Sequence, residues 1–234
     1  MPSVWWWRMP AAAAAWLLPL PGKYSCGCWR MDMLIDLSHP IEAEMPVYPG
    51  DEPVGLKQCR DLVKDHYVAY YWQTGLHAGT HADAPMHLLA GGGDVLSMPL
   101  EHFFAPGVLL ENGVDVPEKD IPEGAAVLID LGAEHLYGAA EYYTDHGCVS
   151  RELCDYLMEK KVCLMGVNAP SPDHPPFPIH KALLGVGIPI LENLTNLQQL
   201  KGRKFTVIAL PLAIRAEGSP VRAAAWIQDE DDAE

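Results

Sequence analysis

The amino-acid sequence predicts a single α/β domain, and two observations carry this prediction. Eight short runs have the composition of β-strands, and one longer segment has the pattern of an amphipathic helix. The chain has 234 residues, of which 49% are hydrophobic. That is enough for one well-buried core and too little for two full domains.

Each predicted strand is rich in β-branched, aromatic or apolar residues and is bounded by Gly, Pro or Asp. These bounding residues favour turns, so the strands should be short. In chain order, the runs cover residues 34–37, 67–73, 108–110, 126–131, 162–167, 188–191, 205–210 and 221–227.

A helix is predicted between the fourth and fifth strands to begin after Ser150. The Ser150 side chain is a good N-cap, and Glu152 would lie in the first turn, where the helix dipole favours an acidic group. Leu153 and Leu157 are spaced to form an apolar stripe. Lys160 then marks the end at which cations are favoured.

Both ends of the chain differ in composition from the predicted domain, which we place at residues 33–228. Residues 1–32 contain three consecutive Trp, five consecutive Ala and several Pro, without helix or strand periodicity. An export signal is one interpretation, but the Trp and Pro fit it poorly. We favour a translated upstream region with natural starts at Met31 or Met33. Residues 229–234 form an acidic tail that we expect to be solvated.

The net charge of −15 excludes several classes of partner. Such a charge repels nucleic-acid phosphates and anionic lipid headgroups, so we expect neither nucleic acid nor a membrane surface as a partner. No apolar run free of Pro reaches the length of a membrane-spanning helix.

The cysteines do not form a disulfide framework. Two of them make a C-x-C pair at Cys26 and Cys28, which alone is a weak metal or disulfide signal. The other four are scattered: Cys59, Cys148, Cys154 and Cys163. A reduced, cytoplasmic setting is the simplest interpretation.

The segment H-A-G-T-H-A-D-A-P-M-H, from His77 to His87, has the composition of a metal site. Imidazole and carboxylate groups are the ligands preferred by zinc, manganese and iron(II). An extended backbone would put His81 and Asp83 on one face, and Gly79 would allow the bend that brings His77 back. A single histidine is usually an ordinary hydrogen-bonded residue, but three beside a carboxylate in so short a segment favour a metal site.

This segment resembles the H-x-G-T-H-x-D-x-P-x-H signature of the metal-dependent cyclase family, which includes bacterial kynurenine formamidases and isatin hydrolases. Three more segments are similar to family motifs: P-V-Y-P-G-D at 46–51, H-K-A-L-L at 180–184 with I-L-E-N-L at 190–194, and G-S-P-V-R at 218–222. The resemblance spans residues 34–227. It implies a swivelling β/β/α architecture, with a barrel-like β core and a few outer helices.

The resemblance also implies a set of metal ligands: His77, His81, Asp83, His180 and Glu192. Five protein ligands exceed what one four-coordinate catalytic ion needs if it keeps a water. We therefore expect two divalent ions per chain, zinc or manganese, with iron(II) also compatible. Asp83 and Glu192 would bridge them, because each carboxylate has two oxygens.

Two further residues are assigned by their positions in the family motifs. His87 matches the proton-transfer histidine, which would act as general acid and base; a further metal ligand or a structural histidine is the alternative. Tyr48 would stack on a planar substrate, or it packs within the protein. Kynurenine formamidases that match these motifs closely have Trp at the position of Tyr48. At the positions of Asn168 and Ala169 they have an acidic residue followed by Thr.

The activity implied by the resemblance is hydrolysis of a carbon–nitrogen amide bond in a small molecule. N-formyl arylamines such as N-formylkynurenine are the first substrate class, as in tryptophan catabolism, with metal-bound hydroxide as nucleophile and His87 as proton carrier. The alternatives are ring opening of a cyclic amide such as isatin, and a metal-binding protein without turnover. Family members also imply a homodimer or a higher homo-oligomer.

Overall fold

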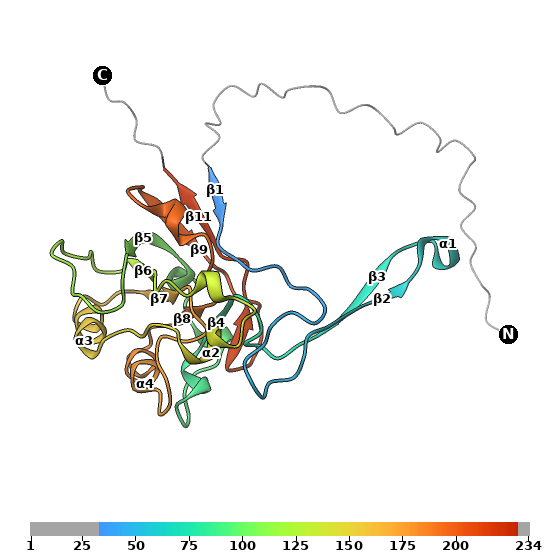
Figure 1. The fold of residues 1–234 in the computed structure, drawn as a ribbon, viewed down its shortest axis with the longest axis horizontal. Coiled ribbons are helices and arrows are strands. Elements are labelled where there is room, and N and C mark those ends of the chain that lie inside the picture. The colour runs from blue at the N-terminus through green and yellow to red at the C-terminus, as the bar shows by residue number, and fades with distance from the viewer. Residues whose placement is uncertain (1–32, 229–234) are drawn as a thin grey trace, which may run out of the picture. The chain divides into compact units, whose positions relative to one another are not determined.

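A computed structural model of the protein describes residues 33–228. The predicted extension at 1–32 and the acidic tail at 229–234 lie outside the described residues. Within the described part, the chain forms a mixed α/β fold around one large sheet (Figure 1).

The large sheet has nine strands in the order β1-β11-β9-β5-β6-β7-β8-β4-β10. Four neighbouring strands, β5 to β8, run parallel, and all other pairs are antiparallel. In chain order, the strands are β1 Leu34–Asp36, β4 His81–Asp83, β5 Phe104–Leu110, β6 Ala126–Ile129, β7 Leu164–Val167, β8 Ile190–Glu192, β9 Phe205–Ile208, β10 Gly218–Pro220 and β11 Ala224–Ile227. The sheet curls into a half-barrel.

The parallel strands at the centre of the sheet are apolar along their whole length. Every residue of β6 and of β7 is buried, as expected for strands covered on both faces. One face packs with α3 Arg151–Glu159 and α4 Pro178–Gly185 in a core that includes Leu153 and Leu183. The other face packs in a second core, which includes Leu128 and Val207. The sheet is therefore covered by an apolar core on each of its faces.

The remaining helices are short. Two are α-helical, α1 Leu62–Asp65 and α2 Glu141–Thr144. Five are 3₁₀ helices: Pro85–His87, Val95–Ser97, Leu100–Phe103, Glu134–Leu136 and Leu197–Leu200. Among the helices of the described residues, none is both long and apolar enough to cross a membrane.

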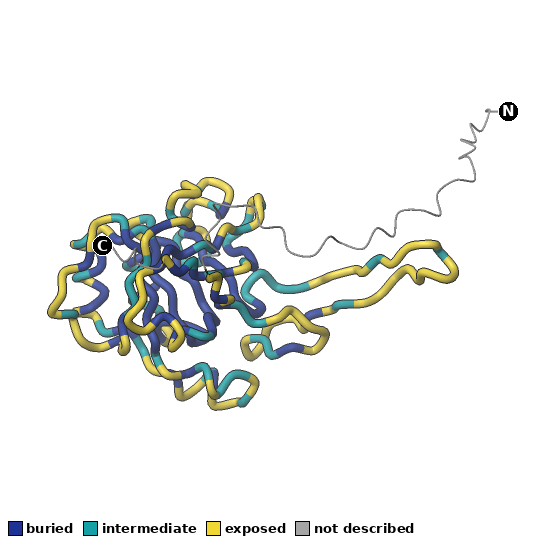
Figure 2. Tube along the Cα trace, turned by 90° about the horizontal axis from the view of Figure 1, so that it is seen from above, coloured by how far each residue is buried: buried dark blue, intermediate teal, exposed yellow. Residues whose placement is uncertain are grey.

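A two-stranded hairpin forms a sheet of its own, separate from the large one. It consists of β2 Gly55–Arg60 and β3 Ala69–Gln73, joined through α1. The hairpin extends from the rest of the described domain (Figure 1), and its surface is largely exposed on both faces (Figure 2). We call residues 55–73 the arm.

The sequence predicted eight of the strands and one of the two longer helices. Each of the eight predicted runs overlaps a strand, although 108–110 covers only the end of β5. The predicted helix is α3, at whose N-cap Ser150 Oγ accepts a hydrogen bond from Leu153 N at 3.1 Å. The missed elements are β2, β4, β10, α1, α2, α4 and the 3₁₀ helices. β4 was missed because its sequence, H-A-D, has no strand-forming side chain, although all three residues are buried.

Candidate metal centre

The candidate centre is built on β4, which lies between β8 and β10 in the large sheet. His81 and Asp83 are two residues apart on this strand, so their side chains share a face. The antiparallel register pairs His81 with Glu192 of β8. Three ligand-type side chains thus meet because two adjacent strands present them side by side.

His77 reaches the same place through a tight turn before β4. The turn depends on Gly79, whose φ of +66° is a conformation that glycine adopts without strain. A Cβ at this position would also lie 2.8 Å from the Met45 side chain. The turn returns His77 to the strand, where its Nδ1 lies 2.9 Å from Asp83 Oδ1. The bend predicted at Gly79 is confirmed.

His180 enters from α4, and Asp173 fixes its orientation. Asp173 Oδ2 accepts a hydrogen bond from Ile179 N at 2.6 Å in the first turn of α4. Its Oδ1 lies 2.6 Å from His180 Nδ1. One buried carboxylate therefore holds both the start of the helix and the imidazole ring, which leaves His180 Nε2 to face Glu192 Oε1 at 2.9 Å.

The contacts within the cluster join two carboxylates to several imidazoles. His81 Nε2 lies 3.4 Å from Asp83 Oδ1 and 3.3 Å from Glu192 Oε2. His180 Nε2 lies 3.6 Å from Asp83 Oδ2. The structure thus brings together all five residues that the resemblance assigned as ligands.

The carboxylates give the cluster a net negative charge when its histidines are neutral. Burial disfavours protonation of His81, but the neighbouring carboxylates of Asp83 and Glu192 raise its pKa to about 10. For His180, burial has the same effect, and contacts with Asp173, Asp83 and Glu192 still raise the pKa to about 12. Burial alone would raise the pKa of Asp83, yet the adjacent histidines hold it well below its usual range. The carboxylates thus attract positive charge into a buried site.

The donor atoms fit a divalent cation. His81 Nδ1 lies 2.8 Å from the Gly79 carbonyl; donating a proton there leaves the lone pair on Nε2, which is a frequent arrangement for a ligand histidine. His81 Nε2 and both Asp83 oxygens are buried without a hydrogen bond within the described residues. Buried polar atoms without partners are costly, so a cation among them would satisfy the site.

Ligand-type atoms gather in two groups that share Asp83. One group is His77, Asp83 and His87, and the other is His81, Asp83 and Glu192; within each group the atoms lie within 4.8 Å of one another. His87 ends the 3₁₀ helix that packs against α4, and its ring centroid is 4.2 Å from that of His77. Burial lowers the pKa of His87 despite the nearby Asp83, so its ring is neutral at neutral pH.

A cavity of about 220 Å³ opens over the cluster. His77, His81, His87, His180 and Glu192 line its floor, and its walls are largely apolar and aromatic, with Pro46, Val47, Tyr48, Leu88, Tyr143, Pro170 and Phe177. Tyr48 lines this cavity and packs edge-to-face on Tyr143 at 5.7 Å between ring centroids. Tyr48 therefore has both a packing contact and a place at the cavity, and its stacking on a planar substrate stays a prediction.

Sequence reasoning missed several residues of the site. Asp173, Asn193 and Tyr143 are the main ones, since Asn193 Nδ2 donates to Gly79 O at 3.0 Å and braces the His77 turn. Their only signal was proximity to motif residues. Asn168, by contrast, does not line the cavity. Its Nδ2 donates a hydrogen bond to Asp130 Oδ1, and its Oδ1 accepts one from Leu131 N.

Comparison with known proteins identifies the family of this chain. The Cyclase family model, described as "Putative cyclase", matches residues 35–174. The kynurenine formamidase of Bordetella petrii is 32% identical over 207 residues, covering 82% of this chain and 97% of that protein. The kynurenine formamidase of Bacillus cytotoxicus is 31% identical over 201 residues, covering 81% and 95%.

Solved structures show the same fold. Isatin hydrolase A from Labrenzia aggregata, bound to benzyl benzoate, superposes with a TM-score of 0.75 at 25% identity, covering 84% of this chain and 94% of that one. Isatin hydrolase A from Ralstonia solanacearum gives a TM-score of 0.73 at 23% identity, covering 84% and 92%. The family model spans more than half of the chain, and the curated relatives exceed 30% identity over most of it, so this protein belongs to the Cyclase family.

Proposed function

We propose that this protein is a metal-dependent amide hydrolase that releases formate from N-formyl arylamines of the N-formylkynurenine class. The observation that carries the proposal is the convergence of His77, His81, Asp83, His180 and Glu192 under an aromatic cavity, with a neutral histidine at its edge. The kynurenine formamidases similar to this chain over most of its length support the substrate class.

We assign two divalent ions, zinc or manganese, to the five ligands. Five ligands support this number, because they exceed what one four-coordinate ion needs if it keeps a water. His77, His81 and His180 all lie beside Asp83, and a carboxylate can offer one oxygen to each of two ions. When bound, such ions polarise a carbonyl and lower the pKa of water.

His87 is assigned as the proton carrier of the reaction. Its neutral ring can accept the proton of the attacking water as the oxygen adds to the formyl carbon. The same ring then returns the proton to the arylamine nitrogen as the carbon–nitrogen bond breaks, so that formic acid and a free amine are the products. Burial favours this cycle because it keeps His87 neutral before each turnover.

The cavity walls supply the preference for an aromatic substrate. Tyr48, Tyr143 and Phe177 line the cavity next to the ligand cluster, and aromatic side chains stack on or pack edge-to-face with planar rings. Tyr48 is partly exposed and lines the cavity, so it is available to such a ring. An aliphatic formamide has no ring and would not make this aromatic contact.

The test is a substrate panel on the metal-loaded protein. N-formylkynurenine, formanilide, an aliphatic formamide and isatin are compared by kcat/KM, with release of formate or of the ring-opened acid as readout. We expect the aryl formamides to be hydrolysed at least tenfold faster than the aliphatic one. Preferential turnover of isatin would overturn the assignment in favour of cyclic-amide ring opening, and no turnover would leave a metal-binding protein.

We further propose that the protein forms a homo-oligomer through the arm. Large apolar side chains of the arm are exposed on both of its faces: Leu62, Val63, Tyr67, Val68, Tyr70, Tyr71 and Trp72. A two-stranded hairpin on its own is marginally stable in water, and an exposed apolar patch of this kind is typical of an interface. A second copy can cover both arms at once, because a twofold axis pairs identical surfaces.

Light scattering on Tyr70→Glu/Trp72→Glu tests this assembly, with Lys119→Glu, at an exposed position outside the arm, as a matched control. We expect the wild type and the control to have the mass of a dimer or more, and the double variant to shift towards a monomer. A monomeric wild type would refute the proposal, as would an unchanged mass in the double variant.

A reducing, cytoplasmic setting completes the proposal. It is supported by Cys59, Cys148, Cys154 and Cys163, which are all free thiols in the structure.

A further inference from the structure

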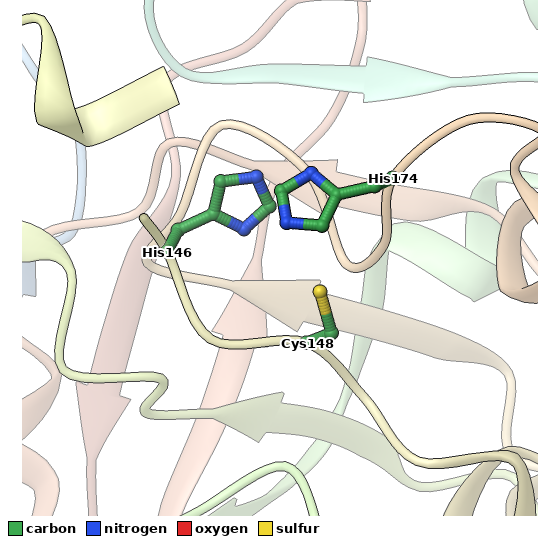
Figure 3. Close-up of side chains that lie close together, drawn as sticks. All are labelled: His146, Cys148 and His174. Carbon is green, nitrogen blue, oxygen red and sulfur yellow. The ribbon is translucent and has the colours of Figure 1, made fainter. Parts of the chain in front are cut away.

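A second cluster of ligand-type side chains lies outside the cavity. His146 and Cys148 belong to the loop between α2 and α3, and His174 belongs to the loop between β7 and α4. One ligand atom from each residue lies within 4.8 Å of the other two. Figure 3 shows the Cys148 sulfur pointing towards the two imidazole rings, whose centroids are 4.3 Å apart.

The two loops are held together independently of these side chains. Val149 N donates a hydrogen bond to Pro172 O at 2.8 Å, which joins the loops beside the cluster. His146 Nδ1 lies 3.0 Å from the Gly147 carbonyl, and donating there leaves Nε2 as the lone-pair nitrogen. The cluster is therefore partly pre-organised, with one ring already held in an orientation suited to a ligand.

This cluster differs chemically from the candidate metal centre. None of its three residues lines the cavity over that centre, which has only nitrogen and oxygen donors. Cys148 adds a sulfur donor, and a thiolate with two imidazoles favours a thiophilic ion such as zinc over the harder ions. His146 is buried, Cys148 half-buried and His174 exposed, so an ion can enter from solvent.

The ionisation of the cluster argues against a nucleophilic cysteine. Burial lowers the pKa of His146, which keeps its ring neutral and able to coordinate. Burial, together with the charge of Asp173, raises the pKa of the Cys148 thiol, whereas a nucleophilic cysteine has a lowered pKa. A bound cation would displace the thiol proton, as in other cysteine metal sites.

We propose that His146, Cys148 and His174 bind one zinc-class ion, with a fourth position left for water or an external ligand. The ion would join the loop after α2 to the loop that carries Asp173, next to His174 in the chain. Through that loop it would support the residue that orients His180 in the candidate metal centre.

Cobalt(II) titration tests this site, because sulfur bound to cobalt gives a charge-transfer band that nitrogen and oxygen ligands do not give. The titration uses a full-length variant with Cys26→Ser and Cys28→Ser, so that the C-x-C pair cannot contribute to the band. We expect the band to reach the amplitude of one cobalt–sulfur site per chain, at up to three added cobalt ions per chain because the candidate metal centre takes two, and to be lost when zinc is added. Cys59→Ser, which removes an exposed thiol of the arm, is the matched control and should keep the full band.

Two variants in the same background decide the assignment of ligands. Cys148→Ser should abolish the band, and His174→Ala should weaken cobalt binding at this site about tenfold or more. His174 is exposed, so its replacement should leave the fold intact, which thermal unfolding can verify. The proposal would be overturned if the starting protein shows no band or if the band persists in Cys148→Ser. It would also be overturned if His174→Ala binds cobalt at this site as tightly as the starting protein does.

Discussion

Asp173→Asn is the substitution that most directly tests how the candidate metal centre is oriented. In the structure, one oxygen of Asp173 lies 2.6 Å from His180 Nδ1, and the other accepts the Ile179 amide proton at 2.6 Å. An asparagine has one oxygen and one NH₂ group, so it can accept at only one of these positions. At the other position, two donors would face each other in a buried site.

The expected loss follows from the role of such partners. Residues that hold a ligand histidine typically contribute 10- to 100-fold to metal affinity or activity. At about 1.36 kcal/mol per decade, this equals about 1.4 to 2.7 kcal/mol. We expect Asp173→Asn to weaken binding of the tighter divalent ion within this range, with kcat/KM on the best formamide falling in parallel at limiting metal.

The assay is competition of the metal-free protein with a chromophoric chelator, followed by thermal unfolding of the same samples. Asp155→Asn is the matched control, since Asp155 is an exposed carboxylate that pairs with Arg151 on α3. Metal affinity equal to that of the wild type in Asp173→Asn would refute the reasoning. Weaker binding accompanied by a collapsed melting temperature of the metal-free protein would instead place the effect in the fold of α4.

Three further predictions concern the same centre. His87→Ala should keep its metal while the single-turnover rate falls about 10²- to 10⁴-fold; metal loss, or rescue by added metal, would make His87 a ligand. Gly218→Ala places a Cβ 2.9 Å from His77 Cε1, so calorimetry should find weaker metal binding with an unchanged circular dichroism spectrum, and wild-type affinity would contradict this. Metal binding near pH 7.5 should release about two protons, from His81 and His180, because their pKa values are about 10 and 12 without an ion. Affinity should therefore rise with pH, and calorimetric enthalpies that do not depend on the buffer would disprove proton release.

The apolar elements of this fold could be predicted from the sequence because their signal is local. The runs that became β6 and β7 are apolar at every position, and α3 carries its own cap at Ser150. The residues of the candidate centre also stood out, since His77, His81 and Asp83 are dense in a short segment. Resemblance to a family supplied His180 and Glu192, which composition alone would not have singled out.

What the sequence could not provide is the set of contacts between distant segments. β4 has no strand propensity and is a strand only because β8 and β10 pair with it on both sides. Asp173 and His174 are neighbours in one Pro-rich loop, yet the first is buried against His180 and the second faces Cys148 and solvent. A local pattern cannot distinguish these two fates, because the packing of α4 and of the loop after α2 determines them. The sequence by itself thus indicated the candidate ligand types and predicted the α/β class. The tertiary structure decided which side chains converge, since convergence depends on strand register and helix docking.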